Sequence, residues 1–207
     1  MLYNKLKYYL LGIIVMIKNF VIDSRSFRSF DESHPITHND LLELVDTARH
    51  CPSARNLQPL KYRLVTDKEE IEDIIASTKW ATSLKDTTLP PEGHHPSAFI
   101  VVCCDTTVSE DTPYCYIDAG IASQTILLRA NEMGFGGCML ASFTPKEISG
   151  NLLIPKKYKP LLVIALGTPD ETVFICNVNE SGSTSYYRDK ANLHFVPKRA
   201  LKDIVIE

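Results

Sequence analysis

Helical and extended patterns of apolar residues alternate along the chain. Between Thr37 and Pro52, apolar side chains recur every three or four residues, which predicts an amphipathic helix with Asp40 in its first turn. Further short helices are predicted over 68–77 and 145–153, and strands over 62–66, 98–104, 138–140 and 161–166. The chain shows no repeat and no linker, so the pattern predicts one α+β domain.

Local signals refine three of these elements. The segment 98–104 is continuously apolar, which is typical of a strand covered on both faces. Thr144 precedes the 145–153 helix and Glu147 follows three residues later, a spacing that predicts a capping box. Residues 80–97 hold three prolines and a glycine and are predicted to form a surface loop.

The longest predicted helix, over 116–133, carries apolar residues on nearly all sides. Such a helix is expected to be buried. Gly120, Ala122 and Ser123 would let another helix approach closely. A chain of 207 residues buries a helix on all sides more easily as a dimer than alone, so this segment predicts a homodimer.

The N-terminus has a short charged segment followed by an apolar segment over 8–17. The apolar segment is shorter than the roughly 20 residues that a membrane-spanning helix needs, and no small-x-small cleavage site follows it. We predict that residues 1–21 form a helical extension that packs on the body or on a partner subunit. A membrane anchor and an upstream start codon, with Met16 as the biological start, are the alternatives.

Composition narrows the class of protein. Hydrophobic residues make up 44% and charged residues 23%, values typical of a folded domain. The net charge of −3 and the isoelectric point of 6.1 argue against nucleic-acid binding. The six cysteines include no C-x-x-C pair, and we expect reduced thiols and a cytoplasmic location. His94 and His95 lack further ligands, so no metal site is predicted.

Three segments far apart in the sequence carry polar side chains that suit a phosphate and a heterocycle. Arginine pairs with phosphate through two parallel hydrogen bonds, while hydroxyl and amide side chains suit hydroxyls or a ring edge. Alone, each segment also fits a solvated surface or ordinary turn chemistry. The segments are 24–30, 51–59 and 194–199.

Together these segments resemble the nitroreductase family of flavin mononucleotide (FMN) enzymes. The family's Arg-Ser-x-Arg-x-Phe signature matches residues 25–30, and its Pro-Ser-x-x-Asn-x-Gln-Pro signature matches residues 52–59. The other matches are the Gly-rich segment 134–143, Ile154-Pro155 with 160–167, and the pair Lys198-Arg199. The resemblance keeps order and spacing from about residue 22, so residues 22–207 are predicted to form a nitroreductase-like FMN-binding domain.

The resemblance implies a mostly antiparallel sheet flanked by helices, and a homodimer in which the long central helix lies at the interface. Each of its two flavin sites would draw on both chains. Phosphate, ribityl and pyrimidine contacts would come from Arg25, Ser26 and Arg28, and further phosphate contacts from Lys198 and Arg199. The partner subunit would supply Pro52, Ser53, Ala54 and Asn56, while Ala141 and Ser142 would lie beside the isoalloxazine.

Two details of this carry-over depend on single residues. Arg28 is the candidate cation near flavin N1 and O2, where reduction places negative charge. Where the family often has an additional arginine before the signature, this chain has Ser24, so some phosphate anchoring is expected from Arg25 or the C-terminal pair. No side chain is expected to act as a nucleophile or acid, because the flavin carries the chemistry. Asp118 and Gln124, polar residues on the long helix, are expected to satisfy buried backbone or the partner helix.

The implied function is an FMN-dependent oxidoreductase with a ping-pong cycle. NADH or NADPH would reduce the flavin at N5, and a small electron-poor acceptor such as a nitroaromatic or quinone would then be reduced. Two alternatives stay open. One is a flavoprotein of the same fold with other redox chemistry, such as reductive dehalogenation or substrate oxidation. The other is an FMN-binding or redox-sensing protein with little turnover.

Overall fold

The computed structural model describes residues 17–81, 84, 87–109 and 113–206. Its main sheet is built on β5 (Tyr158–Pro169), which pairs on one side with β3 (Ala98–Asp105) and on the other with β4 (Gly136–Leu140) and β1 (Phe30–Asp31). β2 (Leu60–Val65) pairs with β3 at the edge. Every pairing in this sheet is antiparallel, as predicted.

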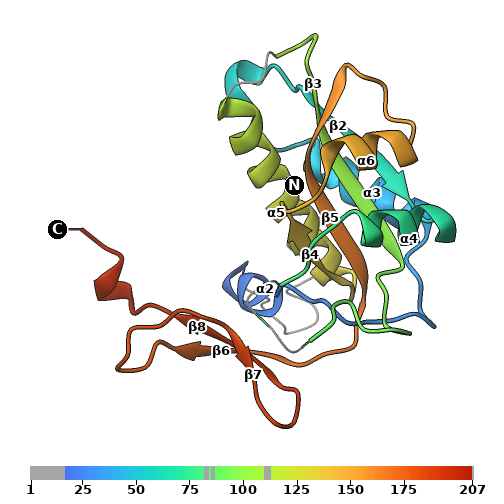
Figure 1. Cartoon of the computed structure of the whole chain (residues 1–207). Helices are drawn as coiled ribbons and strands as arrows, with labels where there is room; N and C mark the ends of the chain where they lie inside the picture. Colours follow the sequence, from blue (N-terminus) through green and yellow to red (C-terminus); the bar gives the residue numbers. More distant parts are fainter. Residues whose placement is uncertain (1–16, 82–83, 85–86, 110–112, 207) are drawn as a thin grey trace, which may run out of the picture.

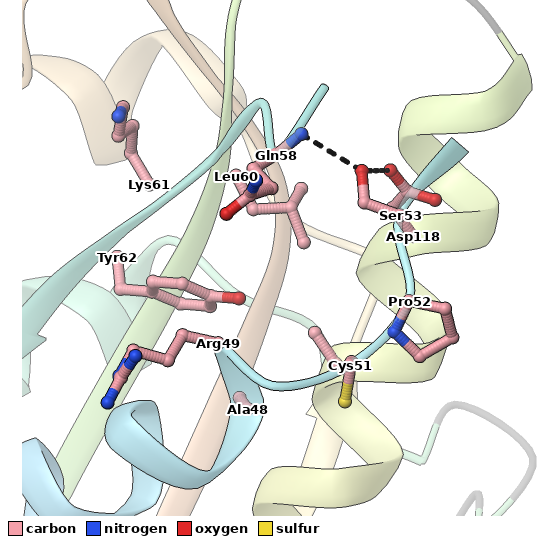
Figure 2. A pocket seen from close by; sticks show the side chains of 11 residues that line it. Ala48, Arg49, Cys51, Pro52, Ser53, Gln58, Leu60, Lys61, Tyr62 and Asp118 are labelled. Atoms are coloured by element: carbon pink, nitrogen blue, oxygen red, sulfur yellow. Dashed lines mark hydrogen bonds between the residues drawn. The ribbon is translucent and has the colours of Figure 1, made fainter. Parts of the chain in front are cut away.

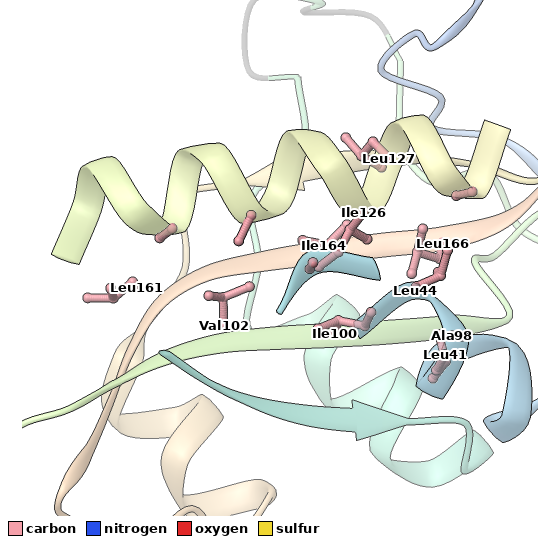
Figure 3. Close-up of a cluster of buried hydrophobic side chains, with 14 of the residues drawn as sticks. Leu41, Leu44, Ala98, Ile100, Val102, Ile126, Leu127, Leu161, Ile164 and Leu166 are labelled. Carbon is pink, nitrogen blue, oxygen red and sulfur yellow. The ribbon is translucent and has the colours of Figure 1, made fainter. Parts of the chain in front are cut away.

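Helices cover both faces of this sheet (Figure 1). On one face, α3 (His38–Ala48) and α5 (Pro113–Glu132) pack against Ile100 and Ile164 (Figure 3). On the other face, α4 (Lys68–Ala76) and α6 (Pro145–Asn151) pack against Val101 and Val163. Alternate residues of a strand point to opposite faces, and both faces are apolar here. This explains why all of β3 is buried, as its uninterrupted apolar sequence predicted.

Two helices, α3 and α4, begin with side-chain caps, and α6 lacks the cap that its sequence predicted. Thr37 caps α3 through a reciprocal capping box with Asp40, and Asp67 caps α4 by accepting the amides of residues 69 and 70. The capping box predicted at Thr144 is wrong, since α6 begins there but the Thr144 side chain makes no capping hydrogen bond. Thr144 instead donates its amide to the Ser77 carbonyl, which ties α6 to the end of α4.

The cysteines correct a second expectation. The structure pairs Cys104 and Cys115 as a disulfide between β3 and α5, with 6.4 Å between their Cα atoms, so the expectation that all six are reduced is wrong for this pair. The remaining cysteines are free, and burial raises the pKa of Cys103 to about 12. Cys103 and Cys104 face opposite sides of the sheet, as predicted.

A second, smaller sheet follows the main one and was not predicted from the sequence. Residues 170–206, the C-terminal arm, contain β6 (Val173–Asn177), β7 (Tyr187–Arg188), β8 (His194–Lys198) and the short helix η2 (Leu201–Asp203). β8 lies between the other two strands, and Phe195 stacks between Phe174 and Tyr187. The arm extends away from the body of the chain (Figure 1).

Near the N-terminus, α2 (Ile17–Asp23) lies beside α5, where the Asn131 side chain donates to the Phe20 carbonyl at 3.4 Å. The predicted helical extension over 1–21 falls mostly on residues 1–16, which lie outside the described residues. Among the helices that the structure describes, none is long and apolar enough to cross a membrane. The boundary between extension and domain stays a prediction.

Candidate functional site

The segment from Ser24 to Arg28 runs beside the start of β4. Ser26 pairs with Gly137 in a parallel bridge, and the Phe27 amide donates to the Gly137 carbonyl at 3.1 Å. A Cβ atom at Gly136 would lie 2.5 Å from the Phe27 ring, closer than real contacts allow. The missing side chain at Gly136 therefore leaves room for the Phe27 ring, and the backbone contacts of Gly137 place the Arg25–Arg28 segment beside β4.

The two arginines of this segment are partly withdrawn from water. Burial lowers the pKa of Arg25, against the opposing effect of the nearby Asp23. Arg25 donates to the Val21 carbonyl, and the Arg28 guanidinium donates to the Ser26 carbonyl at 3.1 Å. The Nε atoms of both arginines are buried and have no hydrogen-bond partner among the residues that the structure describes. Each guanidinium thus keeps donor capacity that the described part of the chain does not use.

Arg28 is also held by the C-terminal arm. Its guanidinium lies over the Tyr186 ring, 5.3 Å from the centroid, and its amide donates to Glu171. Glu171 accepts a further hydrogen bond from Arg188 at 2.5 Å, and its side chain is 3% exposed. Burial opposes ionisation of Glu171, but the nearby His194 ring and the hydrogen bonds from the Arg28 amide and Arg188 together lower its pKa.

The second predicted segment forms a tight loop around η1 (Ala54–Asn56), against the N-terminal half of α5. Asp118 of α5, 5% exposed, accepts hydrogen bonds from the Ser53 hydroxyl at 2.7 Å and the Ala54 amide at 3.0 Å. Ser53 Oγ in turn accepts the Gln58 amide at 3.0 Å (Figure 2). This carboxylate therefore anchors both ends of the loop.

The loop backbone is strained. Arg55, Asn56 and Gln58 all adopt left-handed conformations, with φ of 54°, 54° and 51°. Such a conformation costs a residue other than glycine on the order of 1–3 kcal/mol and persists only where surrounding contacts enforce it. Strain of this kind concentrates at functional sites, so the geometry supports a ligand-facing role for the segment that the sequence singled out.

A hollow of about 230 Å³ lies beside this loop and α5 (Figure 2). Pro52, Ser53, Tyr62 and Asp118 are among the residues that line it. Burial, with Cys51 and Asp118 nearby, raises the pKa of Tyr62 to about 12, so this hydroxyl stays protonated. Asp118 was not among the site residues that the sequence predicted. A carboxylate among the small and apolar residues of a buried helix was the signal that could have identified it.

Ala141 and Ser142 lie at the end of β4, where both are exposed. The Ser142 carbonyl accepts the Lys79 amide at 2.8 Å, and Phe143 pairs with Thr78 in an antiparallel bridge. These bonds fix the exit of β4 against the segment that follows α4. The Arg25–Arg28 segment and the Ala141–Ser142 pair thus lie at the two ends of the same strand.

The predicted pair Lys198 and Arg199 is exposed and lies at or just past the end of β8. His194, at the other end of β8, is 3.7 Å from Glu171 and so lies near Arg28. Four residues of extended strand place Lys198 about 13 Å farther along. The phosphate role that the resemblance implied for Lys198 and Arg199 stays a prediction.

The loop at Ser53 and the segment at Arg25 are also apart within one chain. Asp118 holds the loop near one end of α5, while α2, just before Arg25, contacts Asn131 near the other end. These two positions lie about 20 Å apart along a helix. The two segments therefore do not meet within one chain.

Comparisons with known proteins identify the family of the chain. The model of the nitroreductase family matches residues 23–168. An oxygen-insensitive NADPH nitroreductase of Helicobacter pylori strain 26695 is 25% identical over 176 residues, spanning 70% of this chain and 83% of that protein. A protein of Methanothermobacter thermautotrophicus, provisionally named an NADH dehydrogenase or NAD(P)H nitroreductase, is 27% identical over 151 residues, which span 71% of this chain and 74% of that protein.

Solved structures share the fold. A nitroreductase family protein of Clostridium novyi superposes with a TM-score of 0.63 at 24% identity, covering 75% of this chain and 87% of that one. A protein of Exiguobacterium sibiricum in complex with FMN gives a TM-score of 0.63 at 16% identity, covering 76% and 90%. The matched segment includes the Arg25–Arg28 signature, the strained loop and the Gly-rich strand, and the chain belongs to the nitroreductase family.

Proposed function

We propose that this nitroreductase-family chain, an FMN-dependent NAD(P)H oxidoreductase, acts as a homodimer that reduces small electron-poor acceptors such as nitroaromatics or quinones. The observation that carries the proposal is the placement of Arg25 and Arg28 beside the start of β4, each with a buried guanidinium Nε atom that has no partner among the described residues. Buried polar groups are normally hydrogen-bonded, so two such atoms on neighbouring arginines fit a phosphate-bearing cofactor.

The residues fit FMN in kind and in position. Arg25, Ser26 and Arg28 would hold the phosphate, the ribityl chain and the pyrimidine edge at the start of β4. Ala141 and Ser142 would lie beside the ring system at the end of the same strand. Pro52, Ser53, Ala54 and Asn56 would flank it from the partner subunit, and Lys198 and Arg199 would close on the phosphate.

The exposed face of α5 supports the homodimer. Tyr116, Ile117 and Ile121 are 50%, 55% and 38% exposed on this helix, and a Cβ atom at Gly120 would meet no other atom. A two-fold pairing that covers this face with an antiparallel copy of α5 would bring the loop of one chain toward the Arg25–Arg28 segment of the other. Such a pairing closes the distance of about 20 Å that separates them in one chain.

Bound FMN supplies reversible hydride acceptance, by which NADH or NADPH and then the acceptor exchange electrons in a ping-pong order. The chain supplies binding and electrostatics. The Arg28 cation lowers the energy of negative charge on the pyrimidine side of the ring, and the β4 exit presents backbone to its reactive edge. The strained loop, held by Asp118, offers a fixed wall. Because NAD(P)H is the donor, we also propose a cytoplasmic location.

The absorption spectrum of the purified protein tests this proposal. We expect a yellow protein that bleaches when NADH or NADPH is added without oxygen and regains its colour on addition of a nitroaromatic or quinone. A yellow protein that re-oxidises only with halogenated compounds, or is reduced by another substrate, would favour other redox chemistry. Bleaching with negligible turnover would favour a redox sensor. A colourless protein that takes up no added FMN would contradict the proposal.

A further inference from the structure

We propose that Asp118 is a positioning residue of the flavin site, whose buried carboxylate sets the strained loop in the conformation that meets the cofactor of the opposite subunit. This inference rests on the proposed function. Asp118 would not touch the flavin. It would act through Ser53 and Ala54, and its effect would appear in the active site of the other chain.

The contacts of Asp118 are concentrated on the loop. Its two carboxylate oxygens accept the Ser53 hydroxyl at 2.7 Å and the Ala54 amide at 3.0 and 3.3 Å. The Ser53 hydroxyl also accepts the Gln58 amide at 3.0 Å, so Asp118 restrains Gln58 through Ser53. One side chain on a rigid helix therefore fixes the first and last turns of the loop, with Arg55 and Asn56 between them in left-handed conformations.

Among the described residues, the contacts of the carboxylate all serve the loop. Asp118 makes hydrogen bonds only to loop residues, and no ion pair to it is found among the described residues. A buried carboxylate that a structure retains without a cationic partner needs strong hydrogen bonds, and the loop supplies them. The relation is reciprocal, because the loop's own hydrogen bonds close it on itself, while the carboxylate ties it to α5.

A graded series of variants tests the positioning role. Asp118→Ala removes both acceptor atoms and Asp118→Asn keeps one, so we expect a larger effect from the first. In the protein without FMN, amide hydrogen exchange at Ala54 and Gln58 should become about tenfold faster in Asp118→Ala, because each amide loses a bond directly or through Ser53. The Kd for FMN should rise about tenfold, and the visible circular dichroism of the bound flavin should change.

Ser123→Ala is the matched control. Ser123 is fully buried on the same helix, and its hydroxyl has no hydrogen-bond partner, so exchange, affinity and spectrum should stay as in the wild type. If Asp118→Ala fails to fold, Ser53→Ala is tested instead. It removes the same hydrogen bond by changing the half-buried loop residue and leaves Asp118 in place. Unchanged exchange in the loop together with unchanged FMN affinity would overturn the proposal.

A mixed dimer tests the action across the interface. A subunit with Arg28→Ala paired with a subunit with Asp118→Ala places both defects in one site and leaves the other site intact. We expect such a dimer to regain about half of the wild-type turnover, although both parent homodimers are impaired. Turnover that stays at the parental level would overturn the action in trans. Amide hydrogen exchange in the loop is measured without bound flavin. A wild-type protein that does not bind FMN would therefore contradict the proposed function alone.

Discussion

Arg28 contacts two groups that lie far from it in the sequence and one that lies two residues before it. Glu171 accepts its amide, the Tyr186 ring lies under its guanidinium, and the Ser26 carbonyl accepts one of its donors. The sequence identified Arg28 by its motif, but not the arm residues that hold it. Those residues are separated from it by more than 140 positions, and nothing in a local pattern reports on such a contact.

Replacing Arg28 by alanine tests its role at the scale of one side chain. We expect the Kd for FMN to rise tenfold or more and the flavin reduction potential to become more negative, because a cation beside N1 and O2 favours the reduced form. Equilibrium dialysis and a redox titration measure both. Arg28→Lys keeps the charge and should retain most of the potential. A flavin reduction potential that is equal in all three proteins would show that Arg28 does not lie beside N1 and O2.

Among the elements, the C-terminal arm depends most on tertiary contacts. Its strands are short, and Glu171, which precedes β6, lies beside His194 of β8 and pairs with Arg188 of β7. These groups link the arm to the Arg25–Arg28 segment of the main sheet. By contrast, α3, α4 and β3 are visible in the sequence, because each carries a regular apolar pattern that one local environment explains.

The linkage at Glu171 predicts a pH dependence. A carboxyl whose pKa is lowered by folding contributes stability that is complete above its ordinary value, 4.5, and is lost as the pH falls through the folded-state value. At pH 7, Glu171→Gln should lower the free energy of unfolding by on the order of 2 kcal/mol. Toward acid pH, the difference from the wild type should shrink.

Urea unfolding at pH 7 and at pH 4 measures this difference. Asp46→Asn serves as the control, because Asp46 is an exposed carboxylate paired only with Arg49 and should matter little at either pH. Parallel pH dependences for the wild type and Glu171→Gln would show that Glu171 does not link the arm to the body in the way described.

At the scale of the whole molecule, the proposed site would form between two chains. The loop at Ser53 and the segment at Arg25 lie near opposite ends of α5, and the exposed apolar face of that helix lies between them. The sequence predicted a helix apolar on nearly all sides. The structure of one chain buries only the side that includes Ala122 and Ile126, which leaves the other side for a partner.

Two charges on this face should separate the subunits. We expect Ile117→Asp with Ile121→Asp to give a folded monomer that does not retain FMN, because buried carboxylates without partners oppose association. Light scattering at micromolar concentration measures the mass, and circular dichroism reports the fold. Leu42→Asp is the matched control, since Leu42 is 49% exposed on α3, and should stay dimeric. A wild-type protein that is itself monomeric at this concentration would contradict the proposed homodimer.

The sequence by itself determined the α+β class, most helices and strands of the main sheet, and the family, because apolar periodicity and short motifs are local properties of the chain. It identified Arg25, Ser53 and Ser142 as candidates for the same reason. Only the tertiary structure decided that Asp118 holds the strained loop, that Glu171 ties the arm to Arg28, and that Cys104 meets Cys115. Each of these contacts joins residues whose local sequence is compatible with many partners, and packing of the sheet and helices selects one.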